Sequence, residues 1–239
     1  MPATNVKKTE ADHMAEARAR LISAALPHVP FDGWSSATLN AAIADSGVDT
    51  GLARLVFPRG ALDLALAQHE VGDAALAAAG ASVRTSALRY SEKVARLVRL
   101  RIEGADREVV RRGVTFFALP AHAADGAAAI WRTADLIWRL LGDTSDDFNW
   151  YSKRTILSAV YSSTLLYWLG DDSEGHADTW AFLDRRIGDV MQFEKAKAGF
   201  TRSALGRALQ RGPGRVLERL RAPEAHARDT LPGHLSRRD

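Results

Sequence analysis

The chain has 239 residues, of which 46% are hydrophobic and 26% charged, and its formal net charge is +3. This composition is ordinary for a soluble globular protein that can bury one sizeable core. Cysteine is absent, which excludes disulfides and thiolate metal sites. No apolar run approaches the roughly 20 residues of a membrane-spanning helix, and the first ten residues lack a signal or transit pattern. We therefore expect a cytoplasmic protein that meets a membrane, if at all, at its surface.

The N-terminal segment predicts a helix-turn-helix. The spacing of apolar residues predicts three helices, over residues 11–27, 37–45 and 50–57. Pro27 and Pro30 end the first helix, and Phe31 and Trp34 are expected to anchor the turn that follows. Two helices joined by a tight glycine-containing turn are typical of the helix-turn-helix. The arrangement resembles the N-terminal domain of TetR-type repressors.

The third of these helices is poorly equipped to bind DNA. A DNA-reading helix needs side chains that neutralise phosphates and reach base edges, and residues 50–57 offer only Arg54. Asp49 places a carboxylate where the helix N-terminus would otherwise face a phosphate. We interpret the segment as a scaffold that has lost DNA binding, and we expect no nucleic-acid partner.

The remaining sequence also predicts helices. They are expected over residues 60–81, 84–103, 109–119 and 123–141, and in a hairpin over residues 147–191. No period-two strand pattern occurs, so the fold class is predicted to be all-α. The seven histidines show no metal-ligand spacing, and no nucleophile motif or phosphate loop is present. The acidic residues 171–178 indicate a solvated turn with helix capping rather than a calcium loop. We expect no cofactor, no metal and no enzymatic activity.

Residues 147–191 carry the strongest apolar pattern of the chain. Asp147 is a candidate N-cap, and side chains from Ile156 to Trp168 recur at spacings of three and four. Apolar and aromatic residues spill beyond that face, which indicates a buried helix or one that presents apolar surface to something other than water. The hairpin is therefore either core or the wall of a cavity for an apolar ligand.

The C-terminal part predicts a basic amphipathic helix. Apolar residues share one stripe between Phe193 and Leu209, and residues 195–221 contain eight lysines and arginines. Such a helix lies in a membrane interface, where each well-placed cation contributes roughly 1 kcal/mol. A terminal helix that docks on the protein with its charged face in water fits the pattern equally. The membrane contact is predicted at Phe200, Arg202, Leu205, Arg207, Leu209 and Arg211.

Several motifs together resemble one known family. They are AALPHVPFDGW, WRTADLIWRLLGDTSDDFNWYSKR and YSSTLLYWLGDDSEGHADTWAFLDRRIGDVMQFEKAKA, within residues 16–198. The chain thereby resembles the lipid-binding accessory protein of ubiquinone biosynthesis, the ninth member of the coenzyme Q series. The resemblance implies a TetR-like helical fold without DNA binding, a homodimer and a cavity for isoprenoid lipids. It also implies presentation of quinone intermediates to a di-iron hydroxylase at an anionic membrane surface, on the inner face of the cytoplasmic membrane.

The resemblance also assigns residues. The family's partner-binding motif falls on residues 147–151, which makes Asp147, Trp150 and Tyr151 the predicted hydroxylase contact, although Trp150 could equally be core. The predicted cavity wall consists of Leu136, Ile137, Leu140, Ile156, Val160, Tyr161, Leu165, Trp168, Phe182 and Ile187. The sequence departs from the family at residues 199–222, which are more basic and interrupted by Gly-Pro-Gly.

These assignments define a predicted domain plan. It consists of a helix-turn-helix-like segment (11–58), a helical lipid-binding bundle (59–198), a basic amphipathic membrane helix (199–222) and a disordered tail (223–239). The alternative function is a TetR-type ligand-responsive repressor, which the N-terminal segment supports.

Overall fold

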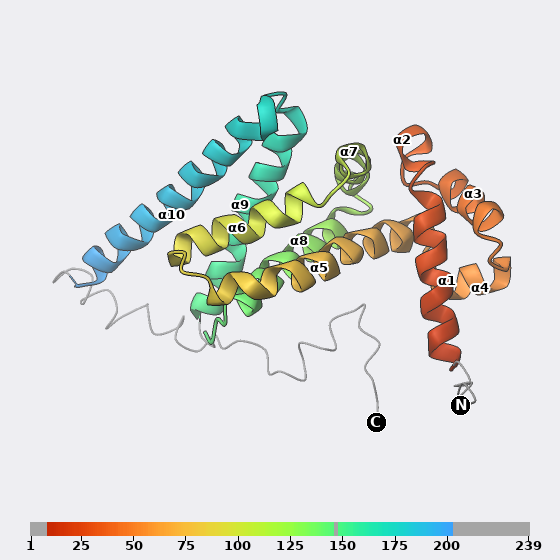
Figure 1. Cartoon of the computed structure of the whole chain (residues 1–239), viewed down its shortest axis with the longest axis horizontal. Coiled ribbons are helices and arrows are strands. Elements are labelled where there is room, and N and C mark those ends of the chain that lie inside the picture. Colours follow the sequence, from red (N-terminus) through yellow and green to blue (C-terminus); the bar gives the residue numbers. More distant parts are fainter. Residues whose placement is uncertain (1–8, 146–147, 203–239) are drawn as a thin grey trace, which may run out of the picture. The chain divides into compact units, whose positions relative to one another are not determined.

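The computed structural model describes residues 9–145 and 148–202, with the backbone alone for Phe148 and residues 193–202. Throughout these ranges the chain forms helices and turns and no β-strand (Figure 1). The all-α fold class is therefore confirmed. The predicted tail and all but the first turn of the predicted membrane helix lie outside the described residues.

The described residues form ten α-helices and one short 3-10 helix. In chain order they are α1 (Glu10–Ala25), α2 (Val29–Asp32), α3 (Ser36–Ser46), α4 (Thr50–Val56), α5 (Ala61–Thr85), α6 (Tyr90–Glu103), α7 (Arg107–Phe117), α8 (Ala123–Leu140), α9 (Phe148–Gly170), η1 (Glu174–His176) and α10 (Ala177–Arg202). Helix α10 runs without a break through residue 198, where the predicted bundle ends.

Helices α1 to α4 form the predicted helix-turn-helix. Helix α1 packs against α3 and α4 and buries Leu21 completely. Helix α3 ends at Gly47, whose φ of 62° lies in the left-handed region that glycine adopts at little cost. Trp34 is buried, as an anchor should be, but Phe31 is 82% exposed. The expectation for Phe31 was wrong because residues 29–32 form the helical turn α2, which directs its ring outward.

The N-terminus of α4 is already occupied by a carboxylate. Asp49 Oδ1 accepts hydrogen bonds from the backbone nitrogens of Gly51 (2.8 Å) and Leu52 (3.2 Å). These amides are the groups that a phosphate would bind at a helix N-terminus. Residues 9–58 contain six acidic and three arginine side chains, a net charge of −3 with histidines neutral. The net charge of this segment gives no general attraction for a polyanion, and the predicted loss of DNA binding stays a prediction.

One helix boundary differs from the prediction. The sequence predicts that one helix ends and the next begins at residues 82–83. In the structure this break between helices lies at residues 86–89, between α5 and α6. Ser86 Oγ donates to the carbonyl of Val83 (2.7 Å), and the Glu92 carboxylate accepts from the nitrogen of Arg89 (2.8 Å). These side-chain bonds satisfy backbone groups at the two helix ends. The apolar pattern does not show them, because the small residues at 79–82 are as compatible with helix as with a loop.

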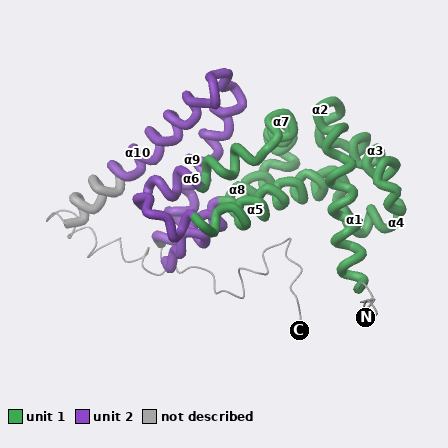
Figure 2. Tube along the Cα trace, in the orientation of Figure 1, with its two compact units in different colours: residues 1–82, 97–133 green, residues 83–96, 134–239 purple. Residues whose placement is uncertain are grey.

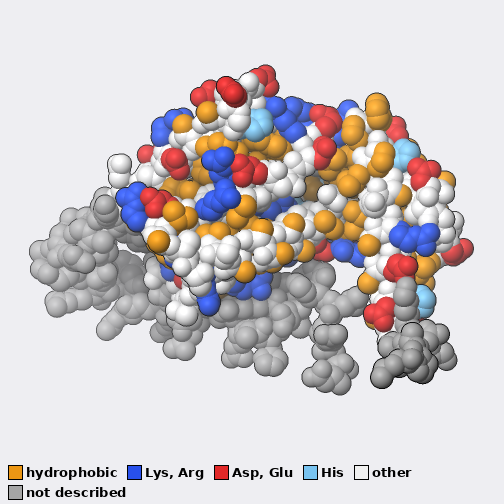
Figure 3. Space-filling view, viewed as in Figure 1, with side chains coloured by type: hydrophobic (Ala, Val, Ile, Leu, Met, Phe, Trp, Pro, Cys, Tyr) orange, Lys and Arg blue, Asp and Glu red, His pale blue; other side chains and the backbone are white. Residues whose placement is uncertain are grey.

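The described helices divide into two compact units (Figure 2). Unit 1 consists of residues 1–82 and 97–133, and unit 2 of residues 83–96 and 134–239. Each unit buries one arginine among apolar side chains, Arg101 in unit 1 and Arg154 in unit 2. Apolar side chains also remain at the surface, interspersed with charged ones on the face drawn in Figure 3.

Unit 1 contains a hydrogen-bonded polar cluster. Arg101 Nε donates to Asp73 (2.8 Å), and its Nη2 donates to the carbonyl of His69 (3.0 Å). Thr133 Oγ1 donates to Asp73 (2.9 Å) and lies 2.8 Å from His69 Nε2. Gly72 makes room for the guanidinium, since a Cβ there would lie 2.6 Å from Arg101 Cζ. The cluster thus fixes how α5, α6 and α8 pack in unit 1.

His69 is neutral in this cluster. Because Thr133 has one hydroxyl proton and donates it to Asp73, His69 Nε2 must carry the hydrogen that Thr133 accepts. Burial lowers the pKa of His69 to about 4. The negative charge of Asp73 raises the pKa by a smaller amount, and the positive charges of Arg101 and Arg132 lower it further. The charged imidazolium is therefore strongly disfavoured in the folded protein.

In unit 2, Asp171 organises the turn between α9 and α10. Its Oδ1 accepts from the nitrogen of Ser173 (2.8 Å), and its Oδ2 accepts from the nitrogen (2.9 Å) and hydroxyl (2.5 Å) of Thr179. Hydrogen bonds from Ser173 and Thr179 lower the pKa of Asp171 far below its ordinary value. The carboxylate thus satisfies one free amide in the first turn of α10, that of Thr179, and one in the preceding turn, that of Ser173. The capping expected in this turn is present, although Asp171 itself is buried rather than solvated.

His69 should make the protein less stable in acid. The unfolded histidine takes up a proton near its ordinary pKa of 6.5, whereas the folded one does so only near 4. Between these values protons bind the unfolded state preferentially, so about 3 kcal/mol of unfolding free energy is lost as the pH falls from 6.5 to 4. We expect His69→Gln, which keeps a donor for Thr133 but cannot titrate, to remove that part of the loss. Urea unfolding of both proteins across this range measures it, and equal pH slopes would contradict the assignment.

Asp171→Ala should destabilise the α9–α10 turn. The substitution leaves the buried hydroxyl of Thr179 and two backbone amides without their acceptor, so we expect a loss of about 1–2 kcal/mol in unfolding free energy. Glu174→Ala is the matched control, because Glu174 is exposed in the same turn. It should change the unfolding free energy by less than about 0.5 kcal/mol. Equal losses in the two variants would show that Asp171 is not a cap.

Candidate functional site on helices α8 to α10

The predicted cavity-wall residues all lie on α8, α9 and α10 within unit 2. Ile137, Val160, Tyr161 and Trp168 are buried. The others are partly exposed, namely Leu136, Leu140, Ile156, Leu165, Phe182 and Ile187. Helices α9 and α10 pack against each other after the turn that joins them (Figure 1). The structure therefore places these residues on three helices of one unit, and their role as a lipid cavity wall stays a prediction.

An apolar surface also faces outward from α9 and α10. Leu166 is 57% and Tyr167 is 40% exposed. The Tyr167 ring stacks on Phe182, with centroids 4.7 Å apart and an interplanar angle of 15°. The guanidinium of Arg186 lies 5.3 Å from the centroid of the same Phe182 ring. This surface is larger than single scattered apolar residues, which makes it a candidate contact with another molecule.

The predicted hydroxylase contact falls at the start of α9. Asp147 lies outside the described residues. Trp150 is only 5% exposed, and Tyr151 is partly exposed. Their rings meet edge to face, with centroids 4.8 Å apart. The indole of Trp150 is thus part of the interior of unit 2, and Tyr151 lies beside it. Of the two possibilities for Trp150, hydroxylase contact or core residue, the structure supports the core residue.

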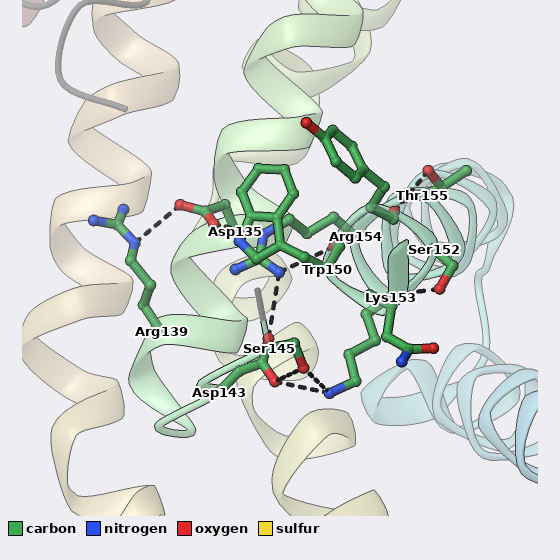
Figure 4. Close-up of polar contacts among 11 residues, drawn as sticks. Asp135, Arg139, Asp143, Ser145, Trp150, Ser152, Lys153, Arg154 and Thr155 are labelled. Carbon is green, nitrogen blue, oxygen red and sulfur yellow. Dashed lines mark hydrogen bonds and ion pairs between the residues drawn. The ribbon is translucent and has the colours of Figure 1, made fainter. Parts of the chain in front are cut away.

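Arg154 holds this part of the site together, and the sequence analysis did not single it out. It is 1% exposed. Its Nε donates to Asp135 Oδ1 on α8 (2.6 Å), and its Nη1 donates to Asp143 Oδ2 after α8 (3.3 Å) and to the carbonyl of Trp150 (3.1 Å). The guanidinium also lies 4.0 Å from the centroid of the Trp150 ring (Figure 4). One side chain therefore ties the first turn of α9 to α8 and to the loop between them.

Asp143 is the second centre of the same cluster. Lys153 Nζ donates to Asp143 Oδ1 (2.8 Å) and to Ser145 Oγ (2.6 Å), and Ser145 donates to Asp143 (2.9 Å). Burial alone would raise the pKa of Asp143, but the hydrogen bonds from Lys153, Ser145 and Arg154 outweigh it and lower the pKa. The carboxylate is therefore ionised at neutral pH and offsets the charge of Arg154.

A sequence signal for Arg154 existed. Trp150, Arg154, Leu157, Tyr161 and Trp168 fall at spacings of three, four and seven, and every one of them is buried. An arginine on such a stripe must find carboxylates inside the protein, because a buried charge without a partner is very costly. Which carboxylates it finds depends on tertiary packing.

The predicted membrane residues lie at or beyond the end of α10. Phe200 and Arg202 are in its last described turn, and Leu205, Arg207, Leu209 and Arg211 lie outside the described residues. Over the ranges that the structure covers, every helix is too short or too polar to cross a bilayer. The membrane contact stays a prediction.

Comparison with known proteins finds similarity in the part of the chain that forms α8 to α10. The sequence model of the COQ9 family matches residues 123–194. The chain is 35% identical over 114 residues to the probable ubiquinone biosynthesis protein coq9, mitochondrial, of Dictyostelium discoideum, covering 47% of this chain and 37% of that protein. It is 29% identical over 201 residues to the mitochondrial ubiquinone biosynthesis protein COQ9 of Drosophila melanogaster, covering 81% and 60%. With the human COQ9 protein the identity is 27% over 192 residues, covering 72% and 57%.

A solved structure gives the fold. A TetR transcriptional regulator from Nitrosomonas europaea superposes with a TM-score of 0.57 at 19% identity, covering 72% of this chain and 97% of that one. This confirms the TetR-like fold. The chain spans less than two thirds of the length of the COQ9 proteins named above. The family resemblance seen in the sequence is confirmed: residues 123–194 match the COQ9 family, and similarity to individual COQ9 proteins extends over as much as 81% of the chain.

Proposed function

We propose that this chain is a non-catalytic lipid-binding protein of ubiquinone biosynthesis. It binds isoprenoid or quinone intermediates and presents them to a di-iron hydroxylase. The observation that carries the proposal is the COQ9 match over residues 123–194, because that range coincides with α8, α9 and most of α10. Those helices contain every predicted cavity-wall residue and the described part of the predicted hydroxylase contact.

The chemistry of this region suits an apolar ligand. The six partly exposed wall residues are aliphatic or aromatic, and each CH₂ of a polyprenyl tail that leaves water there contributes about 0.8 kcal/mol. Charged groups of the same unit are engaged with one another, as in the pairing of Arg154 with Asp135 and Asp143. Such mutually satisfied groups support a binding role and leave chemistry to the partner enzyme.

The proposal includes two further contacts. The outward apolar surface of Leu166, Tyr167 and Phe182 is suited to a second copy of the chain, because two such surfaces cover each other in a homodimer. The basic residues between 195 and 221 suit an anionic membrane surface. The protein would then act as a peripheral protein on the inner face of the cytoplasmic membrane. The relatives that support this function are named as mitochondrial proteins.

The alternative is a TetR-type ligand-responsive repressor, which the structural neighbour favours. The charge of the helix-turn-helix argues against it. Asp49 occupies the N-terminus of α4, and residues 9–58 carry a net charge of −3.

The lipid proposal is tested by identifying what the purified chain carries. We expect mass spectrometry of extracted protein to find an isoprenoid quinone or a phospholipid in roughly equimolar amount. Ile156→Trp adds bulk at a partly exposed wall position and should lower the bound lipid at least twofold. Leu55→Trp, on the exposed surface of α4, is the matched control and should bind as much as the unchanged protein.

The membrane part of the proposal is tested in the same preparation. The full chain should float with phosphatidylglycerol vesicles and do so less at high salt. Protein that contains no lipid and also does not float with the vesicles would contradict the proposal.

DNA binding separates the two functions. We expect no sequence-dependent shift of random genomic fragments at moderate salt, since the acidic helix-turn-helix has little to offer phosphates. Weak shifts that vanish with added salt would come from the basic C-terminal segment, and deleting residues 203–239 should abolish them. A salt-resistant shift of particular fragments would favour the repressor.

A further inference from the structure

Arg154 is placed to control the proposed hydroxylase contact without belonging to its surface. It is 1% exposed, whereas Tyr151, three residues earlier in the first turn of α9, is partly exposed. The two are linked through Trp150. The guanidinium of Arg154 binds the Trp150 carbonyl (3.1 Å) and faces the Trp150 ring (4.0 Å), and that ring packs edge-on against Tyr151 (4.8 Å).

The other side of Arg154 is anchored on different segments. Asp135 is on α8, where Arg139 also pairs with it (3.0 Å), and Asp143 follows α8. The Asp143 side chain is only 4% exposed, so both it and Arg154 have little access to water as an alternative partner. Figure 4 shows Arg154 between these carboxylates and the indole of Trp150. The orientation of the first turn of α9 is therefore fixed by buried charges.

We infer that Arg154 is the positioning residue of the hydroxylase contact: through Trp150 it holds Tyr151 in the orientation that the partner enzyme binds. This inference rests on the proposed function, because it takes Tyr151 as the contact. The planar guanidinium is required. Its Nε and Nη1 atoms donate hydrogen bonds in one plane, while the face of the guanidinium lies against the indole. A lysine ammonium has neither this planar set of donors nor a flat face.

The test compares Arg154→Lys with a variant that is destabilised elsewhere. In the full chain, Arg154→Lys should weaken binding of the purified hydroxylase at least tenfold in calorimetric titration. Amide hydrogen exchange over residues 149–155 should become faster, and the bound lipid should be retained. Leu183→Ala removes a buried side chain of α10 in the same unit. It should lower the melting temperature at least as much, yet keep the hydroxylase affinity within twofold.

Asp135→Asn is the second variant, for the case that Arg154→Lys does not fold. It keeps an oxygen for Arg154 Nε and removes one charge, so hydroxylase affinity should fall severalfold while the fold persists. Equal losses of affinity in Leu183→Ala and Arg154→Lys would overturn the inference, because general destabilisation would then explain both.

Tyr151→Ala separates the inference from the proposal on which it rests. Loss of binding in Tyr151→Ala with unchanged binding in Arg154→Lys and Asp135→Asn would overturn the role of Arg154 and leave the contact in place. Unchanged binding in Tyr151→Ala would remove the contact itself, and the inference with it. The inference is supported if hydroxylase affinity falls in Tyr151→Ala, Arg154→Lys and Asp135→Asn but not in Leu183→Ala.

Discussion

A guanidinium that is shut off from water must be neutralised where it lies, and the arrangement around α9 follows from that constraint. Arg154 stands on the buried stripe of α9 and reaches Asp135 and Asp143. The idealised cost of moving such an ion out of water is of order 20 kcal/mol, so the partners are obligatory. Because the carboxylates belong to α8 and to the loop after it, these contacts fix the first turn of α9 relative to both. The aromatic pair of the proposed partner contact is carried on that turn.

Much of this architecture could be predicted from the sequence, because apolar periodicity reports which face of a helix is buried. The all-α class and the helix-turn-helix follow from it directly. Capping was also predictable at Asp49, which directly precedes a helix start, and within the acidic residues 171–178 as a group, but the sequence did not show that Asp171 is the capping residue. What periodicity does not report is which side chain bonds which across the fold. The helix ends set by Ser86 and Glu92 were therefore misplaced.

The aromatic residues show the same limit. Phe31 and Trp34 are equally apolar in the sequence, yet Phe31 is 82% exposed and Trp34 only 6%. The turn α2 decides between them, and four residues are too few for a periodic pattern. Trp150 was ambiguous for a related reason: an indole at a helix start packs inward or outward according to what lies beneath it. Here Arg154 lies beneath it, at the one charged position on the stripe. Its pairing with Asp135 could not be inferred without the tertiary structure.

The two units use buried arginines in the same way. In unit 1, Arg101 binds Asp73 and the His69 carbonyl beside Gly72, and Thr133 completes the cluster. In unit 2, Arg154 binds two carboxylates and the Trp150 carbonyl. Apolar residues of similar volume would commonly be as stable, so these clusters are weak evidence for stability as such. Their effect is specific alignment: an aliphatic face tolerates sliding and rotation, whereas a guanidinium with fixed donors accepts one register. Under the proposed function, an apolar region that admits a lipid would not be held in register by tight aliphatic packing alone, and directional polar contacts would supply that alignment.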